Sequence, residues 1–245
     1  MTRPTTGSGF ALAFETSSAW GSIALGQGQA VLATRAFSAP RRHAVEFLPT
    51  IQALCQDCSV QPSAIEHVYV SAGPGSFTGL RIGITAARTV AFASGARTVG
   101  VPSLEVIAQN AADAPDPPNR VVVILDAKRK RVYAAAFVRR GGEYVPTTEP
   151  AEVVPAEFLA QQDASSAVLG EGVAYHRAAV EGPSLSVLPE TLNRPRAETV
   201  YRLGAARARL GRFDDPIHLV PIYIRPPEAE EKWRQLHADS NGHSP

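Results

Sequence analysis

A glycine-rich run in the first third of the chain has the residue types that can hold an anion. It reads Gly73-Pro74-Gly75-Ser76-Phe77-Thr78-Gly79, between an apolar stretch and a stretch of helical period. Glycine tolerates positive φ and close approach, and the first turn of a helix offers unpaired N–H groups. A P-loop would end in Gly-Lys-Ser or Gly-Lys-Thr, whereas Leu80 and Arg81 follow Gly79. The run therefore predicts a tight strand–loop–helix connection without a P-loop lysine.

Two acidic residues stand where apolar, strand-like stretches end. Glu15 follows the apolar residues 10–14, and Asp126 follows residues 121–125. Carboxylates there could bind the magnesium ion of a nucleotide, but an acid that only ends a strand and caps a turn is the favoured interpretation. Neither loop offers a lysine dedicated to a phosphate. The candidate residues facing a phosphate or nucleotide are Glu15, Thr16, Ser17, Ser18, Gly73, Gly75 and Asp126.

The histidines and cysteines do not form a recognisable metal or redox motif. Phe47 stands four residues after His43, so a metal-binding His-x-x-x-His pair is absent there, and the other histidines are scattered singly. Cys55 and Cys58 form a C-x-x-C at the end of a helical pattern, whereas redox pairs sit at a helix start. We predict no metal site and no catalytic residue, and a redox module is the least favoured function.

Composition sets the remaining limits. The 245 residues allow one or two domains with a substantial core, and a net charge of +1 gives no strong attraction of the whole molecule to nucleic acid. The basic run Lys128-Arg129-Lys130-Arg131 fits a solvated hairpin tip better than a contact with RNA phosphates, although both stay open. Two cysteines, no signal sequence and no long apolar run predict a cytoplasmic protein that does not enter a membrane.

The periodicity of the chain predicts two α/β halves. Apolar runs predict strands, and positions repeated every three or four residues predict helices, one of them capped by Ser103. The expected strands are residues 10–15, 20–25, 30–37, 65–71, 98–101, 121–125 and 132–138. The expected helices are residues 44–55, 80–94, 103–112 and 199–210. Three prolines in residues 113–119 mark the connection between the halves, each of which opens with a strand that ends in an acid.

The glycine-rich run, extended through Leu80-Arg81-Ile82-Gly83, resembles the signature of the bacterial tRNA threonylcarbamoyladenosine biosynthesis proteins TsaB, also called YeaZ-like. The resemblance covers about residues 10–225. Further segments agree in the same order: Leu12-Ala13-Phe14-Glu15-Thr16-Ser17-Ser18, His43 with Phe47-Leu48-Pro49, Val99-Gly100-Val101-Pro102-Ser103-Leu104, Ile124-Leu125-Asp126-Ala127 and Pro221-Ile222-Tyr223-Ile224-Arg225.

The resemblance implies a duplicated actin/Hsp70-like (ribonuclease H-like) fold, with two α/β lobes and mixed sheets. The repeated order of elements in the two halves agrees. The expected divisions are a tail of residues 1–9, a first lobe of residues 10–112, a second lobe of residues 113–225 whose last helix packs back on the first lobe, and a tail of residues 226–245.

The family also implies a function. It is that of a non-catalytic scaffold for a TsaD-type transferase and a TsaE-type ATPase, which together place threonylcarbamoyl on the tRNA adenosine beside the anticodon. The implied protein requires no cofactor, binds ATP or ADP weakly, contacts tRNA indirectly or weakly and forms a homodimer when alone. The catalytic relatives carry the His-x-x-x-His helix that is missing here. An ATP-binding phosphotransferase or a glycoprotease-like metallopeptidase of the same fold is the alternative.

The first lobe is expected to meet the transferase through its helices. On residues 80–94, one apolar stripe can face the sheet while a second stripe of small residues faces elsewhere, and a helix with two such faces usually has two neighbours. The expected partner-interface residues are His43, Phe47, Ile51, Arg81, Ile82, Thr85, Ala86, Thr89 and Ala93.

Overall fold

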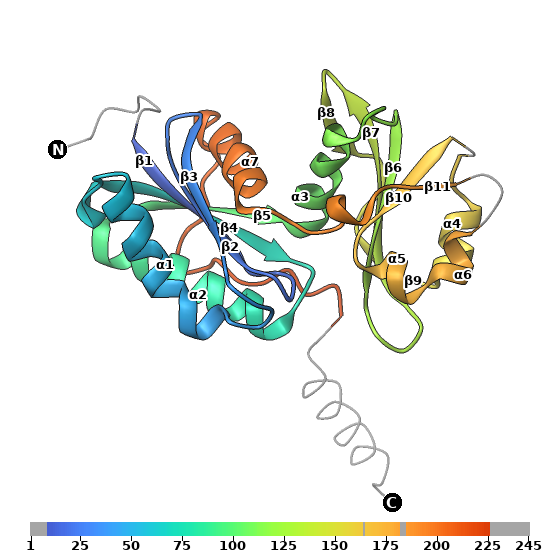
Figure 1. Cartoon of the computed structure of the whole chain (residues 1–245), viewed down its shortest axis with the longest axis horizontal. Coiled ribbons are helices and arrows are strands. Elements are labelled where there is room, and N and C mark those ends of the chain that lie inside the picture. Colours follow the sequence, from blue (N-terminus) through green and yellow to red (C-terminus); the bar gives the residue numbers. More distant parts are fainter. Residues whose placement is uncertain (1–8, 164, 182–184, 226–245) are drawn as a thin grey trace, which may run out of the picture.

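The computed structural model describes residues 9–163, 165–181 and 185–225, which form two α/β lobes side by side (Figure 1). The expected tails lie outside this part of the chain, apart from Gly9. No helix of the described residues combines the length and apolar character that crossing a membrane requires.

The first lobe is a five-stranded mixed sheet with helices on both faces. Its strand order is β3-β2-β1-β4-β5, with β1 to β3 antiparallel and β4 and β5 parallel to β1. The strands are β1 Phe10–Glu15, β2 Ser22–Gln27, β3 Ala30–Ala36, β4 Ile65–Gly73 and β5 Arg97–Pro102. Helices α1 His43–Asp57 and α2 Phe77–Ser94 cover one face, and the short 3-10 turn Pro62–Ala64 precedes β4.

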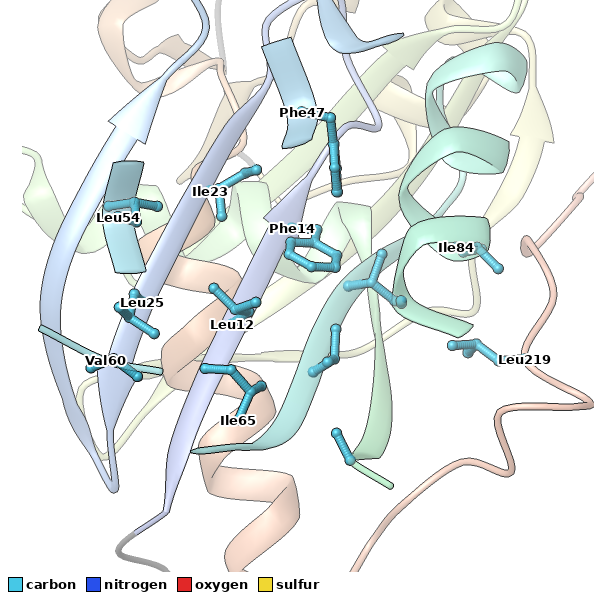
Figure 2. Close-up of a cluster of buried hydrophobic side chains, with 14 of the residues drawn as sticks. Leu12, Phe14, Ile23, Leu25, Phe47, Leu54, Val60, Ile65, Ile84 and Leu219 are labelled. Atoms are coloured by element: carbon cyan, nitrogen blue, oxygen red, sulfur yellow. The ribbon is translucent and has the colours of Figure 1, made fainter. Parts of the chain in front are cut away.

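Side-chain size alternates along the central strands of this sheet and decides what covers each face. Leu12, Phe14, Ile23 and Leu25 point toward α1 and α2, as Figure 2 shows. The alternate residues Ala11, Ala13 and Ala24 lie on the other face, where α7 Ala197–Arg209 packs closely. Small residues on that face leave room for a helix that arrives from the end of the chain.

The second lobe repeats the same sheet. Its order is β8-β7-β6-β10-β11, so β6 corresponds to β1, and the directions match: two antiparallel pairs, then two parallel ones. The strands are β6 Arg120–Asp126, β7 Val132–Arg140, β8 Glu143–Pro146, β10 Ser166–Leu169 and β11 Ser186–Val187, with β9 Ala151–Val153 paired to β7. The repeat confirms the predicted duplicated actin/Hsp70-like fold.

One face of the second sheet carries three short helices. They are α4 Pro155–Ala160, α5 Gly172–Tyr175 and α6 Arg177–Val180. The 3-10 turn Glu190–Leu192 then leads the chain toward α7. The core beneath the helices contains Val122, Ile124, Leu159, Val173 and Val180.

The two lobes exchange their last helices. α3 Ser103–Gln109, which the expected first lobe included, contributes Leu104 and Ile107 to the core of the second lobe and continues as the 3-10 turn Asn110–Asp113. In return, α7 follows the second lobe and packs on the first sheet through Val200 and Tyr201. Each lobe therefore buries a helix whose sequence neighbours belong to the other.

Local details differ from the sequence prediction at two helix starts. Ser103 is the first residue of α3 and does not cap it; instead its hydroxyl accepts a hydrogen bond from the Gly73 N–H at 3.1 Å. Helix α2 begins at Phe77, three residues before the predicted start, because Ser76 caps it by accepting from Gly79 N at 3.3 Å. Gly95 ends α2 in the left-handed conformation, as its sequence predicts.

Candidate functional site

The glycines of the signature let α2 lie directly against the loop that follows β1. A Cβ atom at Gly79 would stand 2.0 Å from the Thr16 carbonyl oxygen, and one at Gly75 would stand 2.2 Å from that of Ser17. The Ser76 N–H donates to the Ser17 carbonyl at 2.7 Å. The structure thus brings together the two loops that we expected to face a phosphate. They face each other, and the Ser76 amide already has an acceptor within the chain.

Glu15 lies beneath this contact and is fully buried. One carboxylate oxygen accepts from the Ser17 N–H and from the Ser17 hydroxyl, both at 2.6 Å, and the other accepts from the Ser71 hydroxyl. Burial raises the pKa of Glu15, although these hydrogen bonds act in the opposite direction. The carboxylate thus fixes the loop that follows β1.

Asp126 ends β6 as Glu15 ends β1, but its surroundings differ. Its carboxylate pairs with Lys128 Nζ at 2.7 Å and with His176 Nε2 at 3.3 Å. Burial alone would raise its pKa, but the hydrogen bonds from Lys128 and His176 outweigh that effect and lower it. The neighbouring Glu171 has a raised pKa because of burial and of the Asp126 charge. The two equivalent acids therefore have opposite pKa shifts.

A pocket of about 230 Å³ opens between the lobes beside these acids. The first lobe contributes residues 17–20 and the second contributes Leu125, Glu171, Ala174, Tyr175, Glu190, Asn193, Arg194 and Pro195, with Ile107 of α3 between them. Cations of the chain itself lie over its two aromatic rings: the Arg194 guanidinium is 4.4 Å from the Trp20 ring, and Lys128 Nζ is 5.5 Å from the Tyr175 ring.

The end segment 221–225 contacts both the glycine loop and the second lobe. The Ile222 N–H donates to the Ala72 carbonyl at 2.7 Å. Gly73 has a φ of +108° and leaves space for Ile222, since a Cβ atom on residue 73 would stand only 2.9 Å from the Ile222 carbonyl oxygen. Arg225 Nη1 donates to the Ala127 carbonyl at 3.2 Å, in the second lobe. The sequence marked this segment only as a motif; its contacts show that it joins the glycine loop to the β6–β7 hairpin.

Comparisons with known proteins identify the family of this chain. The family model "TsaD: tRNA N6-adenosine threonylcarbamoyltransferase" matches residues 37–233. The tRNA threonylcarbamoyladenosine biosynthesis protein TsaB of Bacillus subtilis is 30% identical over 228 residues, which are 91% of this chain and 96% of that protein. The chain belongs to the TsaD-related TsaB family. The TsaB protein of Escherichia coli is 27% identical over 80% of this chain and 85% of its own length.

A solved structure of the TsaB family has the same fold. YeaZ from Pseudomonas aeruginosa superimposes with a TM-score of 0.78 at 27% identity, covering 88% of this chain and 99% of that one. The expected membership of the TsaB family is thereby confirmed in both sequence and fold.

Two of the residues that we expected at a TsaB partner interface are buried inside the first lobe. Phe47 packs edge-on against Phe14 with ring centroids 4.8 Å apart, and His43 Nε2 lies 3.0 Å from the Ser18 carbonyl oxygen. Burial also lowers the pKa of His43. These two residues fasten α1 to the sheet, so they do not form part of an exposed surface. His43 is the first residue of α1, one residue before the expected start of this helix, and it is buried.

The remaining interface candidates divide by exposure. Ile51, Ile82 and Ala86 are half-buried and pack against the core of the lobe. Arg81, Thr85, Thr89 and Ala93 are exposed on α2, and the Arg81 guanidinium lies over the Phe77 ring at 3.9 Å.

Sequence reasoning missed the apolar side chains that α1 and α2 expose. Val45 is 63% exposed, Leu48 67% and Phe92 94%. Leu48 lies in the expected helix 44–55, where the buried residues Phe47 and Leu54 fix the phase of α1 and turn Leu48 outward. The signal in the sequence was a helix with more apolar positions than one buried stripe can accommodate.

The metal and redox motifs stay unsupported in the part of the chain that the structure describes. No group of three or more histidine, cysteine, aspartate or glutamate side chains is placed to hold a metal ion there. Cys55 is buried at the end of α1 and Cys58 follows that helix, and both are free thiols. Burial raises the pKa of the Cys55 thiol, which makes it a poorer nucleophile.

Proposed function

We propose that this protein acts in the biosynthesis of tRNA threonylcarbamoyladenosine as a non-catalytic subunit, which binds a TsaD-type transferase and supports it together with a TsaE-type ATPase. Membership of the TsaB family supports the pathway. The packing of α1 is the observation that best supports the non-catalytic role. Phe47, at the position where catalytic relatives have the second histidine, is a core residue packed on Phe14.

We propose that the protein needs no cofactor and binds ATP or ADP weakly. The Ser76 amide at the start of α2 donates to Ser17, and the Glu15 carboxylate is buried beneath the same loop. Glu171 and Glu190 line the pocket between the lobes, and carboxylates repel the phosphates of a nucleotide. These contacts support weak binding. The protein has the two sheets of a nucleotide-binding fold, but residues of its own chain occupy the place where the phosphates would bind.

The partner surface that we propose is the outer face of α1 and α2. Val45 and Leu48 on α1 and Phe92 on α2 are exposed apolar side chains, and α1 and α2 contact each other on the same face of the sheet. Thr85, Thr89 and Ala93 on α2 are exposed and small, so they allow a second helix to approach closely. The transferase covers this face in the complex, and a second copy of this chain covers it in the free protein.

Co-purification with the transferase subunit tests this surface with a matched pair of variants. Leu48→Arg places a charge at the centre of the proposed interface, and Leu210→Arg places the same charge just after α7 on a leucine of similar exposure, 65%. We expect Leu48→Arg to lose the transferase and Leu210→Arg to retain it, because burying an unpaired charge costs several kcal/mol. Wild-type recovery of the transferase by a folded Leu48→Arg protein contradicts the proposal.

Metal analysis and a tRNA-modification assay separate this proposal from the peptidase and phosphotransferase alternatives. We expect no stoichiometric zinc or iron in protein purified without added metal, and no threonylcarbamoyl transfer by this chain alone. Stoichiometric metal, or modification of tRNA without partners, overturns the non-catalytic role.

A further inference from the structure

The tip of the β6–β7 hairpin keeps three consecutive cations in an unfavourable backbone conformation. Lys128, Arg129 and Lys130 have φ values of +65°, +50° and +61°. A side chain in this left-handed region costs about 1 kcal/mol or more, and tight hairpin turns of this kind prefer Asn-Gly or Gly-Gly. The tip closes normally, with Ala127 N–H donating to Arg131 O at 3.0 Å. The residue types here are therefore not explained by the turn.

Positive charge is concentrated at this tip. Lys128 pairs with Asp126, while Arg131 and Arg225 share Glu152 at 3.2 and 3.3 Å. Lys130 is exposed, and its side chain has no hydrogen bond or ion pair among the described residues. The four consecutive cations 128–131 and Arg225 thus gather in one place, on a protein whose overall net charge is only +1.

The pocket beside the tip has the opposite character. Lys128 spans the two, since its ammonium group lies over the Tyr175 ring at the pocket wall. Glu171 and Glu190 would repel a phosphate inside the pocket, but their oxygens can accept hydrogen bonds from the N–H groups of a neutral base. Trp20 and the Arg194 guanidinium over it form the kind of flat surface on which unstacked RNA bases lie.

The size of the pocket limits what can enter. Its volume of about 230 Å³ is below the roughly 300–1,000 Å³ of pockets that enclose a whole small-molecule ligand. It suits a single base whose sugar and phosphates stay outside, at the level of the hairpin tip.

We propose that the hairpin tip 128–131 and the pocket between the lobes together bind single-stranded RNA, with phosphates on the tip and one unstacked base against the stacked pair of Trp20 and Arg194. The inference rests on the proposed function only in naming tRNA as that RNA. It gives the protein a direct contact with the substrate, where the sequence predicted an indirect or weak one.

Fluorescence anisotropy with an unmodified tRNA transcript tests the tip. The variant Arg129→Gly/Lys130→Gly removes two cations and replaces them with the residue that this backbone prefers, and its melting temperature reports whether it stays folded. We expect its tRNA affinity to fall on the order of tenfold, and the slope of log affinity against log salt to decrease by about 0.7–0.9 for each phosphate that is no longer neutralised. The charge-conserving Arg129→Lys/Lys130→Arg variant should bind as the wild type does. Arg140→Gln, which removes a cation at the far end of β7, should also leave binding unchanged.

Trp20 variants test the base. Trp20→Ala should weaken tRNA binding about 5- to 100-fold, whereas Trp20→Phe should retain most of the affinity, because base stacking needs an aromatic face. A fully duplexed RNA of equal length should compete poorly. Equal competition by duplex, or wild-type affinity in a folded Trp20→Ala protein, overturns the base site.

Transferase recovery, measured on the same variants, separates the two proposals. If the tip variant and Trp20→Ala both recover the transferase and bind tRNA as the wild type does, the RNA site is wrong and the proposed function stands. If the tip variant loses the transferase while its tRNA affinity is unchanged, the RNA site is also wrong, because the tip is then a contact with the protein partner. If the wild type recovers no transferase, the proposed function fails, while the anisotropy of the chain alone still decides the RNA site.

Discussion

Glu15 and Asp126 end equivalent strands of a duplicated fold, and their environments separate their chemistry. Glu15 is enclosed by the glycine loop and accepts three hydrogen bonds, so its carboxyl loses contact with water. Asp126 pairs with Lys128 and with His176 at the edge of a pocket. The sequence predicted both positions, since each acid follows an apolar strand. It could not predict their difference, because the groups around each acid come from distant parts of the chain.

Glu15 predicts a specific pH dependence of stability. Its folded pKa is raised above the ordinary 4.5, so the folded state holds the proton more tightly. Its contribution to stability is therefore present below 4.5 and is lost as the pH rises toward the folded pKa. Glu15→Gln removes this loss. We expect the variant to gain stability relative to the wild type as the pH rises above 4.5, as measured by urea unfolding.

Asp126→Asn serves as the control of opposite sign. The folded pKa of Asp126 is lowered from 3.8, so its contribution is present above that value and is lost as the pH falls. The asparagine variant should therefore lose stability relative to the wild type at neutral pH and approach it in acid. The same pH trend in both variants would contradict the assigned environments.

At the scale of elements, the signature glycines matter because of what they pack against. Gly79 lies within α2, where replacing glycine by alanine ordinarily stabilises a helix by about 1 kcal/mol. Here the new Cβ would stand 2.0 Å from the Thr16 carbonyl oxygen, which is backbone and cannot rotate away. We expect Gly79→Ala to destabilise the protein by about 1–3 kcal/mol or more in chemical unfolding.

A glycine in open space is the matched control for Gly79. Gly141 has a φ of +60°, and a Cβ added there would meet no atom within 4 Å, so Gly141→Ala meets only the backbone penalty. Its cost should be about 1 kcal/mol. Equal costs at the two positions would mean that helix α2 can move away from the loop, and that the glycines are not required for close packing.

The elements of the first lobe, together with β6, β7 and α7, were predicted, because they are long enough for local periodicity to show. The short elements β8 to β11 and α4 to α6 were not predicted, because each has six residues or fewer. The phase of α1 was not predicted either. Its sequence is apolar around most of the helix, with Val45, Phe47, Leu48, Ile51 and Leu54 available, and contact with Phe14 decides which of these are buried. The packing of α3 on the second lobe was not predicted either, because its partners lie later in the chain. The return of α7 to the first lobe was expected, and the small residues Ala11 and Ala13 leave room for it.

At the scale of the whole molecule, the end segment is one of the connections between the lobes. Each lobe has its own core, and α3 and α7 cross between them. The segment then returns to the glycine loop through Ile222, and reaches the second lobe through Arg225, which also lies 3.3 Å from Glu152. A signature loop and an end motif that are distant in sequence are therefore parts of one contact.

Gly73 is the residue of the glycine loop at which a substitution would meet the end segment, although its Cβ would also stand 3.0 Å from Leu80 Cδ1. Gly73→Ala places a side chain at a φ of +108° and 2.9 Å from the Ile222 carbonyl oxygen, so the end segment must move away. We expect faster hydrogen exchange at Ile222 and in the β6–β7 hairpin, with β1 and β4 protected as in the wild type. Arg225→Gln should accelerate exchange in the hairpin alone, since it leaves the bond between Ile222 and Ala72 in place. If Gly73→Ala instead exposes β4 to exchange, the glycine supports the first lobe itself, and the end segment does not join the lobes.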